Sequence, residues 1–251
     1  MQRRFAGLLP LAICSTLFVP AAAFGADLPV KAPIARPIVT QTFNWTGFYA
    51  GLNLGGSWGS QDNALVSTAG ATLASNSDHV DGIIGGGQIG YNWQTNQIVF
   101  GIEADFQGSG QKADGSFSFS PVGFFAAAPP TVTMDYSDKL EWFGTVRGRL
   151  GYAFDRWLPY LTGGWAYGHG VLNGSTAVGA TSFSFSADKD YSGWTVGGGL
   201  EWAFDNHWSA RAEYLYIDFG DGAVAAASPT LNVVSGRLTD NIVRAAVNYR
   251  F

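Results

Sequence analysis

The chain has 251 residues, a formal net charge of −5, and charged side chains that make up 13% of its composition. Soluble domains carry about 25% charged residues, so this composition argues against an ordinary soluble β-sandwich. The acidic balance argues against a nucleic-acid partner. The 34 glycines and 15% aromatic residues, with no apolar run long enough for a membrane-spanning helix after the N-terminus, suit a β-barrel that faces lipid.

The N-terminal segment has the features of a secretory signal peptide. Two arginines precede a short apolar stretch, residues 8–19, and small residues follow it. We therefore predict a signal peptide over residues 1–25. Residues 26–44 contain three prolines spaced by four, which are poorly suited to a central strand, and we expect an extended periplasmic linker there.

From residue 45 onward, apolar and polar side chains alternate, which predicts β-strands with one apolar and one polar face. An aromatic-x-aromatic ending recurs four times, as Tyr91-Asn-Trp93, Tyr152-Ala-Phe154, Trp202-Ala-Phe204 and Tyr249-Arg-Phe251. Turn-like residues follow each of the first three copies. Four strands that end this way and four that return predict an all-β fold, an eight-stranded antiparallel up-and-down transmembrane β-barrel over residues 45–251.

The predicted strands are separated by connections of two kinds. The strands cover approximately residues 45–58, 80–93, 97–107, 138–154, 157–168, 191–204, 208–219 and 241–251. The connections after the second, fourth and sixth strands are short, whereas the others have about twenty to thirty residues. Outer-membrane barrels have short periplasmic turns and long extracellular loops, so we expect the short turns and both termini in the periplasm.

Charged side chains within the strands lie mostly on the parity opposite the apolar one, which faces the lumen. The acidic ones are Glu103, Asp105, Glu141, Glu201 and Glu213, and the basic ones are Arg147, Arg149, Arg211, Arg244 and Arg250. The signs balance, and a buried charge costs several kcal/mol unless it is paired. Because eight strands leave an interior that side chains about fill, we expect a salt-bridged, largely filled lumen. A charged pore is the alternative.

Other motifs give weaker signals. Residues 85–90 match the dinucleotide pattern GxGxxG, but no helix is expected after them, so we interpret these glycines as part of the barrel wall. His79 and His169 could share the extracellular rim and ligate an iron porphyrin; solvated loop histidines are the simpler interpretation. No arrangement of nucleophile, base and carboxylate indicates an enzyme, and no resident cofactor or metal is expected.

The sequence Ser-Phe-Ser-Phe-Ser occurs twice, at residues 116–120 and 182–186, in the predicted second and third extracellular loops. Its alternation favours hairpins that continue as strands above the membrane, stabilised by cross-strand phenylalanine pairs. The alternative is an exposed aromatic patch that includes Phe124 and Phe125 and contacts a ligand or another surface.

Several segments together resemble a known family. They are Asp-Leu-Pro at 27–29, Asn-Trp-Thr-Gly-Phe-Tyr-Ala-Gly at 44–51, Arg-Gly-Arg-Leu-Gly-Tyr-Ala at 147–153, Pro-Tyr-Leu-Thr-Gly-Gly at 159–164 and Tyr-Arg-Phe at 249–251. The family is that of the alphaproteobacterial outer-membrane surface antigens, OmpA-like eight-stranded barrels of the porin family. The resemblance covers nearly all of the chain after the signal peptide.

This resemblance implies a barrel in the outer membrane of a Gram-negative bacterium, in contact with outer-membrane lipid. It also implies that the barrel-assembly machinery reads the terminal strand, with Tyr249 and Phe251 as the signal. Relatives are known as immunogenic or envelope-stabilising proteins, and some bind hemin. We therefore expect a structural surface antigen. The alternatives are a hemin receptor, a small-solute porin, and loops that bind a host or cell-surface ligand.

Overall fold

The computed structural model of the chain describes residues 43–67, 69–70, 72–119, 132–178, 181–221, 224–228 and 231–251. The predicted signal peptide, the predicted linker up to residue 42, and Phe124 and Phe125 lie outside these ranges. No helix in the described part of the chain has the length and apolar character needed to cross a membrane.

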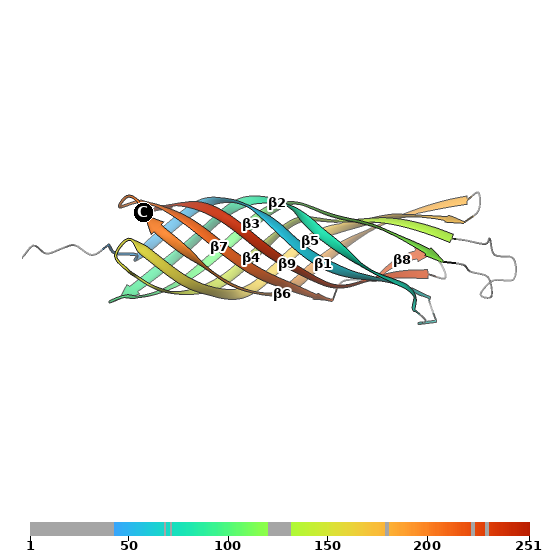
Figure 1. Cartoon of the computed structure of the whole chain (residues 1–251), viewed down its shortest axis with the longest axis horizontal. Coiled ribbons are helices and arrows are strands. Elements are labelled where there is room, and N and C mark those ends of the chain that lie inside the picture. Colours follow the sequence, from blue (N-terminus) through green and yellow to red (C-terminus); the bar gives the residue numbers. More distant parts are fainter. Residues whose placement is uncertain are drawn as a thin grey trace, which may run out of the picture. The chain divides into compact units, whose positions relative to one another are not determined.

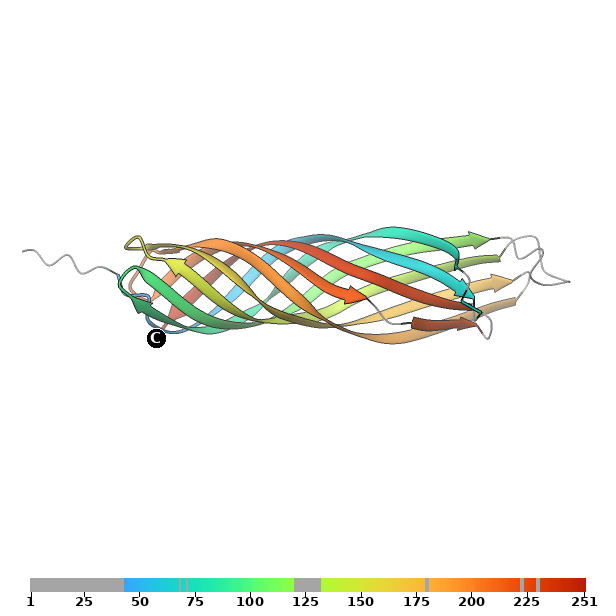
Figure 2. The ribbon, with the colours of Figure 1, turned by 90° about the horizontal axis from the view of Figure 1, so that it is seen from below.

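Nine antiparallel strands form one sheet. They are β1 (Gly47–Ser67), β2 (Thr72–Thr95), β3 (Ile98–Phe119), β4 (Val132–Tyr152), β5 (Trp157–Val178), β6 (Thr181–Ala203), β7 (Trp208–Asp221), β8 (Val224–Ser228) and β9 (Leu231–Arg250). Strands β1 to β7 pair in chain order, and β9 pairs with both β7 and β1, so that eight strands close a ring (Figures 1 and 2). The short β8 pairs with β9. The predicted eight-stranded antiparallel barrel is confirmed.

The outer wall of the ring is apolar. Side chains that point outward include Phe48, Leu52, Ile83, Phe100, Leu161, Val196 and Val243, each at least 47% exposed. In water so many exposed apolar side chains would form an aggregation-prone surface, whereas lipid accommodates them. The opposite parity points inward and carries the buried polar and charged residues together with buried apolar ones.

The four aromatic-x-aromatic endings gather at the end of the barrel that holds the short turns. Their ring centroids lie 4.6 Å apart in Tyr91–Trp93, 4.7 Å in Tyr152–Phe154, 5.9 Å in Trp202–Phe204 and 5.2 Å in Tyr249–Phe251. Aromatic rings with polar edges favour the membrane interface, so this ring of pairs marks the periplasmic side. The C-terminus and the start of β1 lie at the same end (Figure 1).

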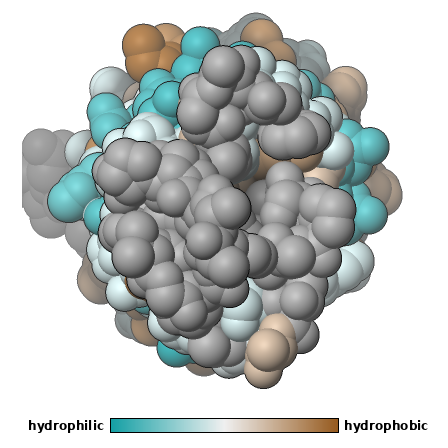
Figure 3. Space-filling view, turned by 90° about the vertical axis from the view of Figure 1, so that its right-hand side faces the viewer, coloured by the Kyte–Doolittle hydropathy of each residue, from teal (hydrophilic) through white to brown (hydrophobic). Residues whose placement is uncertain are grey.

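At the opposite, extracellular end the strands are longer than predicted. Strand β1 continues to Ser67 and β5 to Val178, so residues that we expected in long loops belong to strands. They stay extended because their inward side chains form a second apolar core. Its buried members are Leu65, Phe117, Met134, Tyr136 and Leu172. Hydrophilic and hydrophobic residues are both visible around the rim of this end (Figure 3).

The ring also divides at this end. Strand β2 pairs with β3 only as far as Asp81–Lys112, and β6 pairs with β7 only as far as Trp194–Asp218, within the described residues. Beyond these pairs, β3, β4, β5 and β6 continue as one sheet, while β2, β1, β9 and β8 continue as another. Residues from β1 and from β3 to β5 meet in the second apolar core.

Candidate functional site in the barrel lumen

Eight charged side chains point into the barrel at mid-height. They are Glu103 and Asp105 on β3, Arg147 and Arg149 on β4, Glu201 on β6, Arg211 and Glu213 on β7, and Arg244 on β9. Each is at most 5% exposed. We call this set the lumen network. The strand alternation places all eight on the inner face.

Arg147 lies at the centre of the lumen network and contacts three carboxylates. Its guanidinium donates to Asp105 and to Glu213, each at 3.0 Å, and also to Glu103. Arg244, across the lumen on β9, lies 2.9 Å from Asp105 and 2.7 Å from Glu213. Two arginines therefore clamp the same pair of carboxylates from different strands.

The lumen network continues toward the periplasm through Glu201. Arg149 donates to one of its carboxylate oxygens at 2.8 Å. Ser209 donates to the other at 2.6 Å, and the amide of Asn248 donates to that same oxygen at 2.9 Å. Gln88 then donates to Asn248 at 2.7 Å. Polar contacts thus connect the strands around the lumen at this level.

Two buried tyrosines complete the lumen network. Tyr49 on β1 lies across Gly90 on β2 and donates to Glu103 on β3 at 2.6 Å. Tyr160 on β5 lies in the same way across Gly199 on β6 and reaches a carboxylate on β7. A Cβ atom at either glycine would collide with the tyrosine ring, so glycine is required beneath it. The sequence pattern does not single out these tyrosines, because the signal appears only once the strand register is known.

The charges of the lumen network sum to zero, with four carboxylates and four guanidinium groups. Removing two opposite charges from water is expensive, and their attraction offsets this only with good geometry and further hydrogen bonds. Here Glu103, Asp105, Glu201 and Glu213 each accept from at least one arginine. The arrangement is chemically suited to holding strands together, because every carboxylate is engaged by a cation.

Apolar side chains fill the lumen on the extracellular side of the network. They are Val80, Ile84, Ala113, Leu140, Phe143, Ala166, Tyr191, Leu215, Ile217, Phe219, Leu238 and Ile242. Beyond them Lys189 pairs with Asp138, which also accepts from Gln61 at 2.9 Å. The second apolar core follows. The described lumen is therefore filled by this mainly apolar cluster, which also holds a hydrogen bond from Gln111 to Asp240 at 2.8 Å, and by polar groups on either side of it.

A short segment ahead of β1 covers the periplasmic mouth. We call Phe43, Asn44 and Trp45 the periplasmic cap. Trp45 is 2% exposed; its backbone N–H donates to the Gln94 side chain at 2.7 Å and its indole N–H to the Asp155 carbonyl at 3.1 Å. The indole packs in a cluster with Val99, Ala153, Leu158 and Ala203. Residues 43 and 44 were expected in a linker, but they lie against the barrel.

Two of the predicted lumen charges lie elsewhere. Glu141 is exposed on the outer wall, because a β-bulge between Leu140 and Trp142 shifts the alternation by one residue and turns Leu140 inward instead. Arg250 lies half-buried at the periplasmic rim, where it donates to the carbonyl oxygens of Asn44 and Asn206. The prediction that these two side chains join the lumen network is wrong.

The two histidines considered for hemin do not face each other. His79 on β2 and His169 on β5 both point outward, and β3 and β4 lie between their strands. His169 stacks on Trp142 with centroids 5.8 Å apart, and its Nδ1 lies 2.8 Å from Asp190. That hydrogen bond raises the pKa of His169. Joint ligation of one iron by both histidines does not fit this placement.

The Ser-Phe-Ser-Phe-Ser segments form strand ends whose described phenylalanines point inward. Phe117 is 3% exposed and stacks on Tyr136 at 5.0 Å, and Phe185 packs against the same core. Phe117 lies opposite Met134 and Phe185 opposite Gly174, so the expected cross-strand phenylalanine pairs are not formed by these two residues. An exposed aromatic patch does not fit their burial either.

The tyrosine and phenylalanine of the predicted assembly signal lie at the end of β9. Phe251 is 78% exposed on the outer wall, its ring rests edge-on against Tyr249, and its N–H donates to the Phe48 carbonyl at 3.0 Å. This contact ties the last residue of the chain to the first strand of the ring.

Comparisons with known proteins agree with this architecture. Residues 11–251 match the model of the outer membrane protein beta-barrel domain. The chain is 37% identical over 244 residues to a 31 kDa outer-membrane immunogenic protein of Brucella melitensis, covering 91% of this chain and 93% of that protein. It is 29% identical to a 25 kDa outer-membrane immunogenic protein of Brucella abortus, covering 97% and 99%.

A solved structure supports the fold independently. The outer membrane protein OprG of Pseudomonas aeruginosa superposes with a TM-score of 0.50 at 9% identity, covering 84% of this chain and 99% of that one. With the family-model match over most of the chain, the resemblance predicted from the sequence motifs and the location in a Gram-negative outer membrane are both confirmed. The chain belongs to the outer membrane protein beta-barrel domain family, with outer-membrane immunogenic proteins among its relatives.

Proposed function

We propose that this protein is a structural barrel and surface antigen whose filled lumen does not conduct ions or solutes. The observation that carries the proposal is the lumen network, eight buried charges of balanced sign. Apolar layers lie on both sides of it, around Phe143 toward the cell exterior and around Trp45 toward the periplasm. The names of the immunogenic relatives support the antigen part.

An ion that crossed the barrel would have to break this arrangement in sequence. It would first displace the apolar layer that contains Phe143, where an unpaired charge is strongly disfavoured. It would then have to separate Arg147 from carboxylates at 3.0 Å. The proposal assigns no catalytic role to these carboxylates, because arginines already engage them.

The test is single-channel recording of the refolded protein in a planar bilayer. We expect no steady conductance above that of the bare membrane. Reproducible steps of constant size would overturn the closed lumen and favour a small-solute porin. A variant with Phe143→Gly and Leu215→Gly, which thins the apolar layer, provides the comparison: if it conducts while the parent chain is silent, that layer forms the barrier.

We further propose that the barrel-assembly machinery recognises the terminal strand through Tyr249 and Phe251. Both rings lie on the outer wall, where another protein can reach them before lipid does. The hydrogen bond from the Phe251 N–H to the Phe48 carbonyl joins the two ends of the ring, so the strand that carries this signal is also one of the two that close the barrel.

A further inference from the structure

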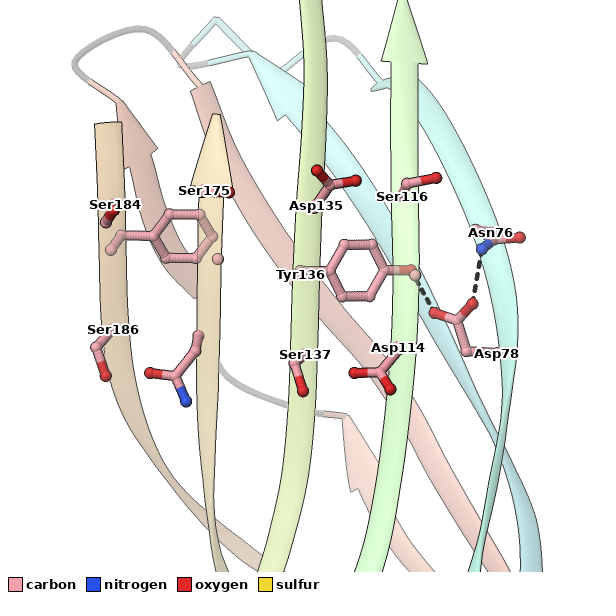
Figure 4. Close-up of a pocket in the computed structure, with 14 residues that line it drawn as sticks. Asn76, Asp78, Asp114, Ser116, Asp135, Tyr136, Ser137, Ser175, Ser184 and Ser186 are labelled. Carbon is pink, nitrogen blue, oxygen red and sulfur yellow. Dashed lines mark hydrogen bonds between the residues drawn. The ribbon is translucent and has the colours of Figure 1, made fainter. Parts of the chain in front are cut away.

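A hollow of about 1080 Å³ lies on the wall of the strand extensions above the membrane. It runs across β3, β4, β5 and β6 and ends beside Asn76 and Asp78 on β2 (Figure 4). Neither the lumen network nor the periplasmic cap uses these residues. We call this hollow the wall groove.

Two rows of polar side chains border the wall groove. The upper row in Figure 4 is Ser116, Asp135, Ser175 and Ser184, one from each strand. The lower row is Asp114, Ser137, Asn173 and Ser186. Register pairs these residues directly across neighbouring strands. Seven of the eight are exposed and Ser137 is half-buried, so both rows stand on the outer wall.

The floor between the rows carries no outward side chain. Its four residues are Gly115, Tyr136, Gly174 and Phe185, which register places side by side. Tyr136 turns inward across Gly115 and donates to Asp78, while Phe185 turns inward across Gly174. The outer face of the floor is therefore backbone. Both Ser-Phe-Ser-Phe-Ser segments contribute here, with serines bordering the groove and phenylalanines in the core beneath it.

We propose that the wall groove binds a neutral saccharide chain laid across the strands. Sugar hydroxyl groups need partners that both donate and accept, and serine and asparagine do both, while aspartate accepts. Neighbouring strands lie about 4.8 Å apart, and residues two apart on one strand lie about 7 Å apart. A saccharide laid across the groove therefore meets another pair of polar side chains, one from each row, at each strand.

The composition of the wall groove excludes other ligand classes. No lysine or arginine lines it, whereas Asp78, Asp114 and Asp135 do, so sulfated or phosphorylated glycans meet like charge. Lys112 and Lys139 stand opposite each other one row below the groove, outside its lining. No large apolar side chain is exposed on its floor, which leaves a hydrophobic peptide without an anchor.

The direction of the wall groove identifies the source of the saccharide. Both rows stand on the outer wall of β3 to β6, so the groove faces sideways from the barrel. A chain bound there lies beside the protein, above the lipid. We assign the occupant to the saccharide portion of glycolipids anchored in the same outer leaflet.

The experiment measures saccharide binding to the full-length protein purified from outer membranes. The detergent must have a head group without sugar, because a maltoside would compete for the wall groove. Saturation-transfer NMR with maltohexaose detects contact, and titration gives the dissociation constant. The variants are Ser175→Leu, which fills the middle of the groove, and Asp135→Asn, which removes a carboxylate but keeps its shape. Ser182→Leu, exposed on β6 outside the groove lining, is the matched control.

We expect maltohexaose to bind the parent chain and Ser182→Leu equally, to bind Asp135→Asn more weakly, and to lose binding to Ser175→Leu. The neutral saccharide portion released from the producing bacterium's own outer-leaflet glycolipid should displace it. Absence of binding, retention of binding by Ser175→Leu, or tighter binding of a sulfated heparin hexasaccharide would overturn the saccharide assignment. Failure of this neutral saccharide to compete would overturn the assigned source. None of these results bears on conductance, so the saccharide proposal and the closed-lumen proposal can each be overturned independently of the other.

Discussion

Arg147 shows how much one side chain supports in this barrel, because it contacts three of the four lumen carboxylates. Replacement by methionine keeps most of the volume but leaves buried carboxylates without a cation. We expect Arg147→Met to lower the free energy of unfolding by about 3–5 kcal/mol, the usual effect of breaking a buried pair from one side. Urea titration in lipid vesicles measures the change.

The control for this variant is Lys112→Met, because Lys112 is exposed on the wall above the membrane. Surface substitutions of this kind change stability by about 0.5 kcal/mol or less. Equal losses of unfolding free energy in both variants would mean that Arg147 stabilises the barrel through its volume or its net charge alone. The argument from ion pairing would then be wrong.

His169 offers a second test at this scale. Its Nδ1–H donates to the Asp190 carboxylate at 2.8 Å, and this hydrogen bond raises the pKa of His169 because it favours the charged imidazolium. We expect NMR titration to place the pKa above the ordinary value of about 6.5 and Asp190→Asn to lower it. The charged form is then populated at higher pH in the parent chain than in the variant. An unchanged pKa would contradict the assigned contact.

Side-chain placement was predictable from sequence where alternation holds and not where it breaks. Parity alone placed Glu103 and Arg147 on the inner face, as the structure has them. Parity gave the wrong side for Glu141, because it assumes unbroken alternation and the sequence does not reveal where a β-bulge interrupts it. Tyr49 could not be found either, since its role depends on a glycine opposite it on the next strand.

Among the elements, the periplasmic cap makes contacts that no strand alternation predicts. Trp45→Ala would leave the periplasmic cluster without its largest side chain, and we expect a loss of about 3–5 kcal/mol in the free energy of unfolding. Amide hydrogen exchange at Val99 and Ala153 should accelerate at the same time. Trp93→Ala is the matched control, because Trp93 is 47% exposed on the lipid face. Slow exchange at Val99 in Trp45→Ala would count against a cap.

The terminal strand carries a prediction about assembly. Deletion of Phe251 removes an outward aromatic that is 78% exposed and the contact of its N–H with Phe48. We expect slower insertion and less heat-modifiable barrel in outer-membrane fractions, measured by gel shift after pulse labelling. Phe204→Ala changes a similar exposed ring at the same rim and should insert normally. Normal insertion of the shortened chain would refute the terminal signal.

The existence and direction of the strands followed from the sequence, but their extracellular ends did not. Strand β1 runs nine residues past Trp58, where we expected it to end, because inward residues such as Leu65 find a core supplied by other strands. That core depends on contacts between distant segments, which no local pattern reports. The short β8 escaped prediction for the same reason, since it exists only by pairing with β9.

At the scale of the whole molecule, a filled barrel with a lipid-facing wall is suited to strengthening the membrane around it. A strain without this protein should be several-fold more sensitive to detergents and to large antibiotics, and the parent chain supplied in trans should restore resistance. The Ser175→Leu variant changes the wall groove but not the lumen, so it should restore resistance as the parent chain does if the structural role is independent of saccharide binding. Wild-type resistance in the deleted strain would contradict the structural role.

The periplasmic cap also has a consequence for how a cell distinguishes finished barrels from unfinished ones. Its partners come from separate hairpins: Gln94 lies near the end of β2, Asp155 follows β4, and Arg250, whose guanidinium carbon lies 4.1 Å from the centroid of the Phe43 ring, ends β9. The cap therefore has a complete docking site only after the ring has closed. We therefore expect residues 43–45 to be accessible to periplasmic proteases in an incompletely inserted barrel and protected once the ring has closed.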